Sequence, residues 1–248
     1  MNHKEDKRSA LSEQNMILDI HTHTCASGHA FGTIREMALA AKERGLLLLG
    51  VSEHAPGVPG TCDPIYFSNL WVAPRQLYGV EIIHGCEINV LNDGTLSLER
   101  KFMEKLDYGI VGIHRTCYQD AGMDKNTDNL ISCMKDEKVF FVSHPDDDHT
   151  PLDYERLVAA ARKYHVALEL NNSSLLKPNQ RLNCVQNYKQ ILRLCRNAQW
   201  PIIINSDAHD PNYVGRFSEA LALLEEEDFP AELILNRDVN TFKSFLGR

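Results

Sequence analysis

Seven short apolar runs, separated by segments with helical periodicity, constrain the fold of this chain more than any other feature of its sequence. Each run has the length of a buried strand, and most carry isoleucine, valine and leucine on both faces, as strands of a parallel sheet do. Strands and helices in alternation predict repeated βα units and an α/β fold. The runs cover residues 17–20, 46–51, 80–86, 108–113, 139–142, 166–170 and 202–205.

The segments between the runs carry helix signals. Thr33 followed by Glu36 has the pattern of a capping box, and residues 153–165 and 215–227 repeat apolar side chains at helical spacing. Residues 55–75 are rich in proline at first, which predicts a long loop over one end of the sheet. Seven parallel strands with outer helices favour a barrel or distorted barrel, and an open doubly wound sheet is the alternative.

Length and composition predict one soluble domain. The chain has 248 residues, of which 43% are hydrophobic and 24% charged, so it can bury a substantial core. Residues 1–15 are polar and are interpreted as a flexible extension, and residues 16–248 as a single catalytic domain. Seven scattered cysteines without a Cys-x-x-Cys pair are typical of a reduced, cytoplasmic protein.

Imidazole and carboxylate side chains follow almost every apolar run. Because the carboxyl ends of parallel strands meet on one face of a barrel, these residues are expected to converge there. They are the ligand types that zinc, manganese and iron prefer, and they are too many for one ion, so two or three metals are expected. The candidates are His21, His23, His29, His54, Glu87, His114, His144, Asp207 and His209.

Most of these histidines, taken singly, are more often ordinary loop residues than ligands, and only their joint placement favours a metal centre. Asp19 or Glu53 are suitable neighbours for fixing an imidazole tautomer. Residues 171–174 either order the site by hydrogen bonds or are merely polar. Residues 146–148 are expected to form a solvated acidic loop. Non-ligand roles are expected for His3, His84, His149 and His165.

Two arginines, Arg115 and Arg75, are candidate substrate-binding residues, because a guanidinium can hold a phosphate through two parallel hydrogen bonds. The formal charge of −8 argues against a stable nucleic-acid partner, since the surface as a whole repels a polyanion. No segment resembles a signal peptide or a membrane span, so no membrane partner is expected. A homo-oligomer remains open.

The motifs resemble those of the PHP (polymerase and histidinol phosphatase) domain superfamily, over residues 16–246. The resemblance is specific to the small stand-alone phosphatase branch, and Glu53 stands where aspartate is commoner. The matching segments are residues 19–24 with His29, 51–54, 85–89, 112–114, 142–145 and 205–209.

This resemblance implies a distorted (β/α)7 barrel with three metals at the carboxyl ends of its strands. It implies zinc in the first place, with manganese or iron as alternatives. One metal would be held by His21, His23, Glu87 and Asp207, a second by Glu87, His114 and His144, and a third by His29, His54 and His209.

The expected activity is hydrolysis of a small phosphate monoester by a metal-bound hydroxide, with no other catalytic group identified. Three alternatives stay open. They are a phosphodiesterase or nuclease of the same superfamily, an amidohydrolase, and a non-catalytic metal-binding regulatory domain.

Overall fold

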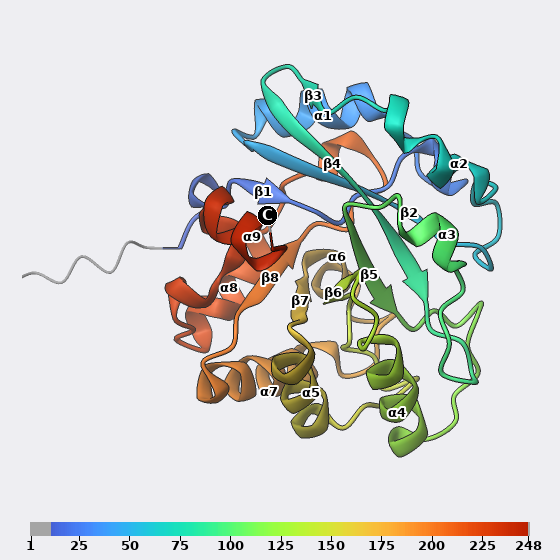
Figure 1. Ribbon diagram of the computed structural model, residues 1–248. Coiled ribbons are helices and arrows are strands. Elements are labelled where there is room, and N and C mark those ends of the chain that lie inside the picture. The colour runs from blue at the N-terminus through green and yellow to red at the C-terminus, as the bar shows by residue number, and fades with distance from the viewer. Residues whose placement is uncertain (1–10, 248) are drawn as a thin grey trace, which may run out of the picture.

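The strands form a nearly closed parallel barrel with helices outside it (Figure 1), in a computed structural model that describes residues 11–247. Parallel neighbours follow one another in chain order, so the sheet has no switch point, and the α/β distorted (β/α)7 barrel is confirmed. The open doubly wound alternative is wrong. The barrel strands are β1 (Leu18–Asp19), β2 (Leu48–His54), β4 (Val80–Asn89), β5 (Tyr108–Gly112), β6 (Val139–Val142), β7 (Ala167–Asn171) and β8 (Ile202–Asn205).

Where β8 meets β1, side chains replace much of the backbone ladder. One isolated parallel bridge joins Thr22 to Ala208. The Asn236 side chain donates to the carbonyls of Leu18 and Ile204, at 2.9 and 2.6 Å, and so bridges the two strands from one side. Since the peptide groups at this seam are satisfied individually, the barrel closes here with fewer direct strand-to-strand bonds than elsewhere.

The longer helices cover the outside of the barrel. The capping box is present, because the Thr33 hydroxyl accepts from the Glu36 amide while the Glu36 carboxylate accepts from Thr33. The helix expected from residue 215 begins at Ser218, since Gly215 has a left-handed φ of 67°. The long helices are α1 (Ile34–Glu43), α4 (Met123–Cys133), α5 (Tyr154–Tyr164), α7 (Cys184–Ala198) and α8 (Ser218–Glu226).

Shorter elements fill the connections. The long loop over residues 55–75 contains two single-turn helices in its second half, and a two-residue strand, β3 (Gln76–Leu77), pairs antiparallel with β4. The short helices are α2 (Ile65–Ser68), α3 (Arg100–Met103), α6 (Asn172–Leu176), α9 (Val239–Phe245), η1 (Glu13–Asn15), η2 (Cys25–Ser27), η3 (Leu70–Val72), η4 (Pro211–Tyr213), η5 (Ala231–Leu233) and η6 (Leu235–Arg237).

Large aromatic side chains fill the barrel interior. Tyr108 is fully buried and its hydroxyl donates to the Ile20 carbonyl at 2.5 Å. Gly85 makes room for it, since a Cβ there would lie 2.5 Å from the Tyr108 Cζ atom. Phe242 and Phe245 of α9 pack against this core from the amino ends of the strands. The carboxyl ends are therefore the face left for function.

Residues 11–15, expected to belong to a flexible extension, pack on the domain. Residues 1–10 lie outside the described residues, but Leu11 packs against the core and η1 follows it. The Glu13 carboxylate accepts from the Phe217 amide at 2.8 Å, which fixes residues 11–15 to the domain. Among the described helices, none combines the length and the apolar character that crossing a membrane requires.

Candidate metal centre

The nine predicted ligands lie together at the carboxyl ends of the strands. They lie within β2 and β4, in the segments that directly follow β1, β5, β6 and β8, and after η2. Two of them, His144 and Asp207, have left-handed φ angles of 28° and 51°, which is uncommon for residues other than glycine. The chain thus accepts backbone strain at two positions where a strand end turns its side chain into the site.

Glu87, at the end of β4, lies at the centre of this group. Its side chain is fully buried, and imidazole nitrogens surround both of its oxygens. The Oε2 atom lies 3.3, 3.5 and 2.9 Å from His21, His23 and His54, and the Oε1 atom lies 3.0 and 2.8 Å from His114 and His144. One carboxylate therefore contacts five of the eight other candidates.

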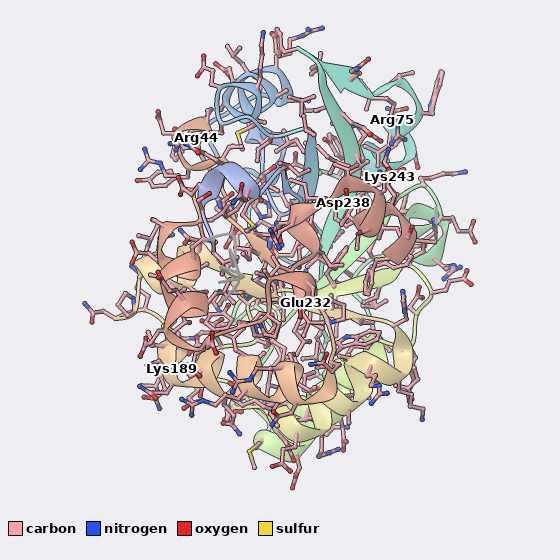
Figure 2. The ribbon with its side chains drawn as sticks, turned by 90° about the vertical axis from the view of Figure 1, so that its left-hand side faces the viewer. Arg44, Arg75, Lys189, Glu232, Asp238 and Lys243 are labelled. Atoms are coloured by element: carbon pink, nitrogen blue, oxygen red, sulfur yellow. The ribbon has the colours of Figure 1, made fainter. Side chains whose placement is uncertain are left out.

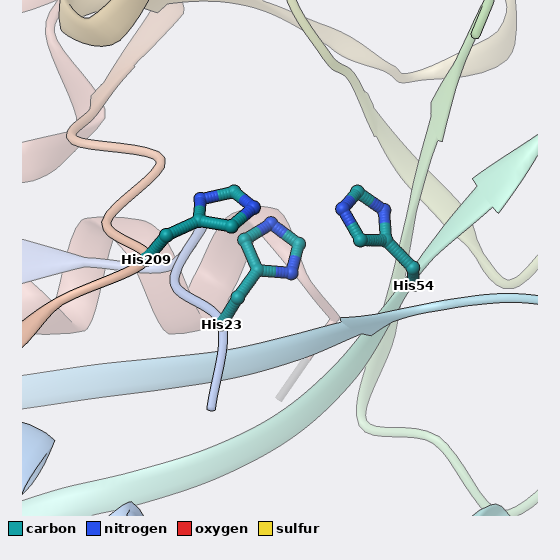
Figure 3. Close-up of side chains that lie close together, drawn as sticks. All are labelled: His23, His54 and His209. Atoms are coloured by element: carbon teal, nitrogen blue, oxygen red, sulfur yellow. The ribbon is translucent and has the colours of Figure 1, made fainter. Parts of the chain in front are cut away.

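Asp207 and the remaining imidazoles extend the group. The Asp207 Oδ1 atom lies 3.6 Å from His21 Nε2 and 3.3 Å from His23 Nε2. The Nε2 atoms of His209 and His29 lie 3.1 Å apart. Figure 3 shows how His23, His54 and His209 turn their rings toward one another, with centroids 4.2 Å apart for His23 and His54.

The polar atoms of this group lack other partners, which is the condition that cation binding would satisfy. His21 Nε2, His23 Nε2, His54 Nδ1 and Glu87 Oε2 are buried and have no hydrogen-bond partner. Leaving such atoms unpaired is costly, and nitrogen and carboxylate oxygen in this mixture suit zinc, manganese or iron. Donor atoms lie within 4.8 Å of one another in three groups: His23, His54 and His209; His21, His23 and Asp207; His54, Glu87 and His114.

These overlapping groups fit more than one metal ion. His54 belongs to two of them, and in one it stands with Glu87 rather than with the expected partners His29 and His209. Its ring still lies near both, with centroids 5.0 and 5.8 Å away. The structure therefore places His54 between two expected metal positions.

Charge within the cluster keeps the carboxylates ionised. Burial opposes ionisation of Glu87, yet His114 and His21 hold its pKa well below the usual range. Burial likewise opposes ionisation of Asp207, whose pKa is held low by His21 and His23. Burial and the neighbouring His54 lower the pKa of His23, so its imidazole is neutral. Although burial opposes it, Glu169 and Glu87 hold the pKa of His21 well above its usual value, so this ring would release a proton on binding a metal, which takes neutral imidazole and ionised carboxylate.

Glu169, in β7, is a functional residue that the sequence reasoning missed. It is buried, and its Oε1 atom lies 2.6 Å from His21 Nδ1, which leaves Nε2 of that ring facing Glu87. It also accepts from the His144 amide at 2.7 Å. A glutamate in the otherwise apolar run of residues 166–170 was the signal that could have identified it.

Two acids proposed as tautomer-fixing neighbours act differently. Glu53 reaches His23 only through Ser27, whose hydroxyl donates to Glu53 at 2.6 Å and lies 3.1 Å from His23 Nδ1. Asp19 contacts no ring nitrogen. It accepts from the Ser206 hydroxyl and the Gly215 amide, which fixes the segment after β8. Burial raises the pKa of Asp19 to about 6.

The polar segment after β7 orders the site by hydrogen bonds, one of the two roles expected for it. The Asn171 side-chain amide donates to Asp207 at 3.3 Å and to Glu169 at 3.0 Å. The predicted solvated loop is wrong for Asp146, which is buried and pairs with Arg181 at 3.4 Å. Burial raises the pKa of Asp146 to about 7.

A basic cavity of about 320 Å³ adjoins the candidate ligands. It is lined by the cationic side chains of Arg115, Lys177 and Arg181, together with His114 and the carboxylates of Asp147 and Asp207. Arg115 was expected there, whereas Lys177 and Arg181 were not, because they lie in a connection without any motif of their own. Three cations against two carboxylates, beside the ligand candidates, make this cavity suitable for an anionic substrate.

Arg75 does not reach the site. It precedes β3 and forms an ion pair with Asp107, the residue before β5, so it lies toward the amino ends of the strands. Figure 2 shows it in the same region of the surface as Lys243 of α9, which bonds to Glu81. From this position Arg75 cannot hold a substrate bound at the cluster.

The histidines outside the set have other partners. His84 Nε2 lies 3.0 Å from the Pro74 carbonyl, and His165 Nε2 lies 3.0 Å from the Phe245 carbonyl. His149 pairs with Asp147 on the surface. These contacts agree with the non-ligand roles expected from the sequence, and His3 lies outside the described residues.

Comparison with known proteins decides the family. The model of the PHP domain matches residues 19–173, more than half of the chain. The chain belongs to the PHP family. A protein of Clostridium novyi named probable phosphatase is 36% identical and covers 93% of this chain and 94% of its own length. A protein of Caldanaerobacter subterraneus, also named probable phosphatase, is 38% identical and covers 93% of this chain and 91% of its own length.

Two solved structures share this fold. The histidinol phosphate phosphatase of Lactococcus lactis, solved with zinc, L-histidinol and phosphate, has a TM-score of 0.59 at 17% identity and covers 87% of this chain and 95% of its own. A chain of an archaeal ribonuclease P complex has a TM-score of 0.60 at 16% identity, over 93% and 90%. At these identities the likeness concerns the fold, and function must be argued from the site.

Proposed function

We propose that this PHP protein is a metal-dependent phosphatase that hydrolyses small phosphate monoesters with three divalent metal ions, zinc in the first place. The observation that carries the proposal is the buried, orphaned Oε2 of Glu87 among imidazole nitrogens, beside a basic cavity. We assign one ion to His21, His23, Glu87 and Asp207, a second to Glu87, His114 and His144, and a third to His29, His54 and His209.

The bound ions would supply Lewis acidity and a nucleophile formed from water at neutral pH. The chain itself positions the ligands and the substrate. Glu169 holds the His21 ring so that Nε2 faces inward, and Ser27 orients His23 in the same way. Arg115, Lys177 and Arg181 face the basic cavity and would hold phosphate oxygens there.

A monoester is favoured by the shape and charge of the site. The three cations line one cavity of about 320 Å³. A terminal dianionic phosphate offers several oxygens to such a site, whereas a long polyanion needs a basic track and meets a net charge of −8. The names of the curated relatives, probable phosphatases, point the same way.

The test is hydrolysis by protein reconstituted with zinc, manganese or iron. We expect p-nitrophenyl phosphate to be hydrolysed much faster than its bis-ester or a labelled oligonucleotide. Glu87→Gln should reduce its hydrolysis to nearly the rate without enzyme. Faster cleavage of the oligonucleotide would assign a nuclease activity, and cleavage of amides an amidohydrolase. No hydrolysis by protein shown to be fully metal-loaded would identify a non-catalytic domain.

A further inference from the structure

A second cavity, of about 450 Å³, lies beside the same metal centre. It contains the ligand candidates Asp207 and His209, and it shares Asp207, Ser173 and Lys177 with the basic cavity. A molecule bound through its phosphate in the basic cavity can therefore extend into the second one without leaving the protein surface.

Three large apolar side chains line this second cavity, which we call the apolar cavity. Phe31, Leu176 and Tyr213 are 81%, 46% and 49% exposed. Single exposed apolar side chains are common on protein surfaces, and other exposed apolar residues of the described chain, such as Leu47 and Trp71, do not line this cavity. Three that converge on one cavity with two metal-ligand candidates are typical of a binding site.

Hydrogen bonds fix the backbone segments that carry these three side chains. The Phe31 amide donates to the His209 carbonyl at 2.8 Å, which ties it to a ligand candidate. Tyr213 ends η4, whose first turn is capped by Asp210. Leu176 ends α6, which Asn171 caps at its start. The backbone around the cavity is therefore already ordered before a ligand binds, which lowers the ordering cost of binding.

A cation completes the wall of the apolar cavity. The Arg216 guanidinium lies 5.3 Å from the centre of the Tyr213 ring, a distance typical of a cation–π contact. Both residues line the cavity, so this contact restricts the Tyr213 ring at the cavity wall. Asp207 and Lys177 lie where this cavity meets the basic one and where the reacting phosphate would lie, and the charged pair Asp210 and Arg216 lines the wall beside Tyr213.

We propose that the apolar cavity binds the leaving group, and that the substrate class is phosphate monoesters of alcohols that carry an apolar chain or ring. This inference rests on the proposed phosphatase function. Hydrolysis forms a bond from the water oxygen to phosphorus and breaks the bond from phosphorus to the alcohol oxygen. One proton of the water goes to the alcohol, and the other stays with the phosphate.

The test is a series of alkyl phosphates, ethyl, butyl and hexyl, whose leaving groups differ in apolar length but hardly in acidity. A fully buried methylene strengthens binding about fourfold, and a half-open cavity should give about twofold. Ethyl and hexyl phosphate differ by four methylenes, so we expect kcat/KM to rise about 16-fold between them. Calorimetry with ethylphosphonate and hexylphosphonate, which also differ by four methylenes, should show the same ratio in Kd on metal-loaded protein.

Variants locate the effect. In Phe31→Ser/Leu176→Ser the ratio between hexyl and ethyl phosphate should fall toward one. Trp71→Ser, which removes an 80% exposed side chain of η3, should leave both rates unchanged. If the double variant keeps the wild-type ratio between hexyl and ethyl phosphate, the cavity is not the leaving-group site. The assignment also fails if the only effect of the double variant is that a dimer becomes a monomer in gel filtration.

The outcomes separate this inference from the function on which it rests. If wild-type protein hydrolyses ethyl, butyl and hexyl phosphate equally well, the phosphatase stands and the apolar cavity is not a leaving-group site. If it hydrolyses none of the esters, including p-nitrophenyl phosphate, the proposed function itself is wrong.

Discussion

Because Glu87 contacts five imidazoles, a change at this one side chain should disturb several ligand positions together. Glu87→Gln keeps the shape but removes the charge that the surrounding histidines stabilise, since the pKa of Glu87 is held low. We expect kcat/KM to fall by more than about 100-fold, beyond the usual effect of an outer-sphere change. Metal content should fall with it, measured by mass spectrometry of the purified variant.

His84→Gln is the matched control for this prediction. His84 is also a buried residue of β4, but its ring contacts the Pro74 carbonyl and no ligand candidate. Its replacement should leave the metal content near that of the wild type. Equal losses in the two variants, at equal thermal stability, would contradict the central role of Glu87.

Glu169 offers a second prediction, because it orients a ligand without belonging to the set. Glu169→Ala leaves His21 Nδ1 and the His144 amide without their partner inside the protein. We expect metal affinity to fall about 10- to 100-fold, as measured by competition with a chromogenic chelator. Glu169→Gln keeps one acceptor oxygen and should recover part of that loss. If alanine and glutamine behave alike, tautomer control by Glu169 is excluded.

At the scale of the strands, Gly85 of β4 leaves the space that the Tyr108 ring of β5 occupies inside the barrel. Gly85→Ala would place a Cβ against the Tyr108 ring, and such overpacking typically lowers the free energy of unfolding by about 1–3 kcal/mol. In a Tyr108→Leu background the same change should be less costly. Urea denaturation of the four proteins in this double-mutant cycle measures the coupling, and strictly additive effects would show that the ring is not the obstacle.

The strands were predictable because fully buried parallel strands are continuous apolar runs. The runs 139–142 and 202–205 match β6 and β8, and the run 80–86 continues as β4 to Asn89. Strand β3 is only two residues long and pairs with the start of β4, so it is too short to show an alternating or apolar pattern in the sequence. The start of α8 was missed because apolar spacing begins before the backbone leaves the left-handed turn at Gly215.

The ligand candidates were predictable for a topological reason, and their surroundings were not. Residues at the ends of successive parallel strands must meet, whatever lies between them. Lys177 and Arg181 reach the basic cavity from the connection after α6, whose path no local pattern determines. The burial of Asp146 depends on Arg181, a partner 35 residues away, and a run of aspartates gives no sign of it.

Across the whole molecule, the seam between β8 and β1 should depend on the metals. His21 and His23 lie on one side of it and Asp207 and His209 on the other, so shared metal ions would join the two sides. Removing the metals with a chelator should therefore speed amide exchange of residues 18–23 and 202–209 more than that of β4 and β5. Hydrogen exchange read by mass spectrometry tests this, and uniform acceleration of all strands would contradict it.

The same seam determines when the centre can assemble on the ribosome. Ile20 and Asn205, which it joins, are 185 residues apart in the sequence, so β1 emerges long before its neighbour has been translated. At common elongation rates of about 5–20 residues per second, this interval lasts roughly 10–40 s. During it the nascent chain carries unpaired histidines from β1, β2 and β5 that can capture stray cations. The proposed metal centre can therefore be completed only after β8 has been translated. A translational stall before Asp207 would leave a chain with some of the candidate ligands but without the last two.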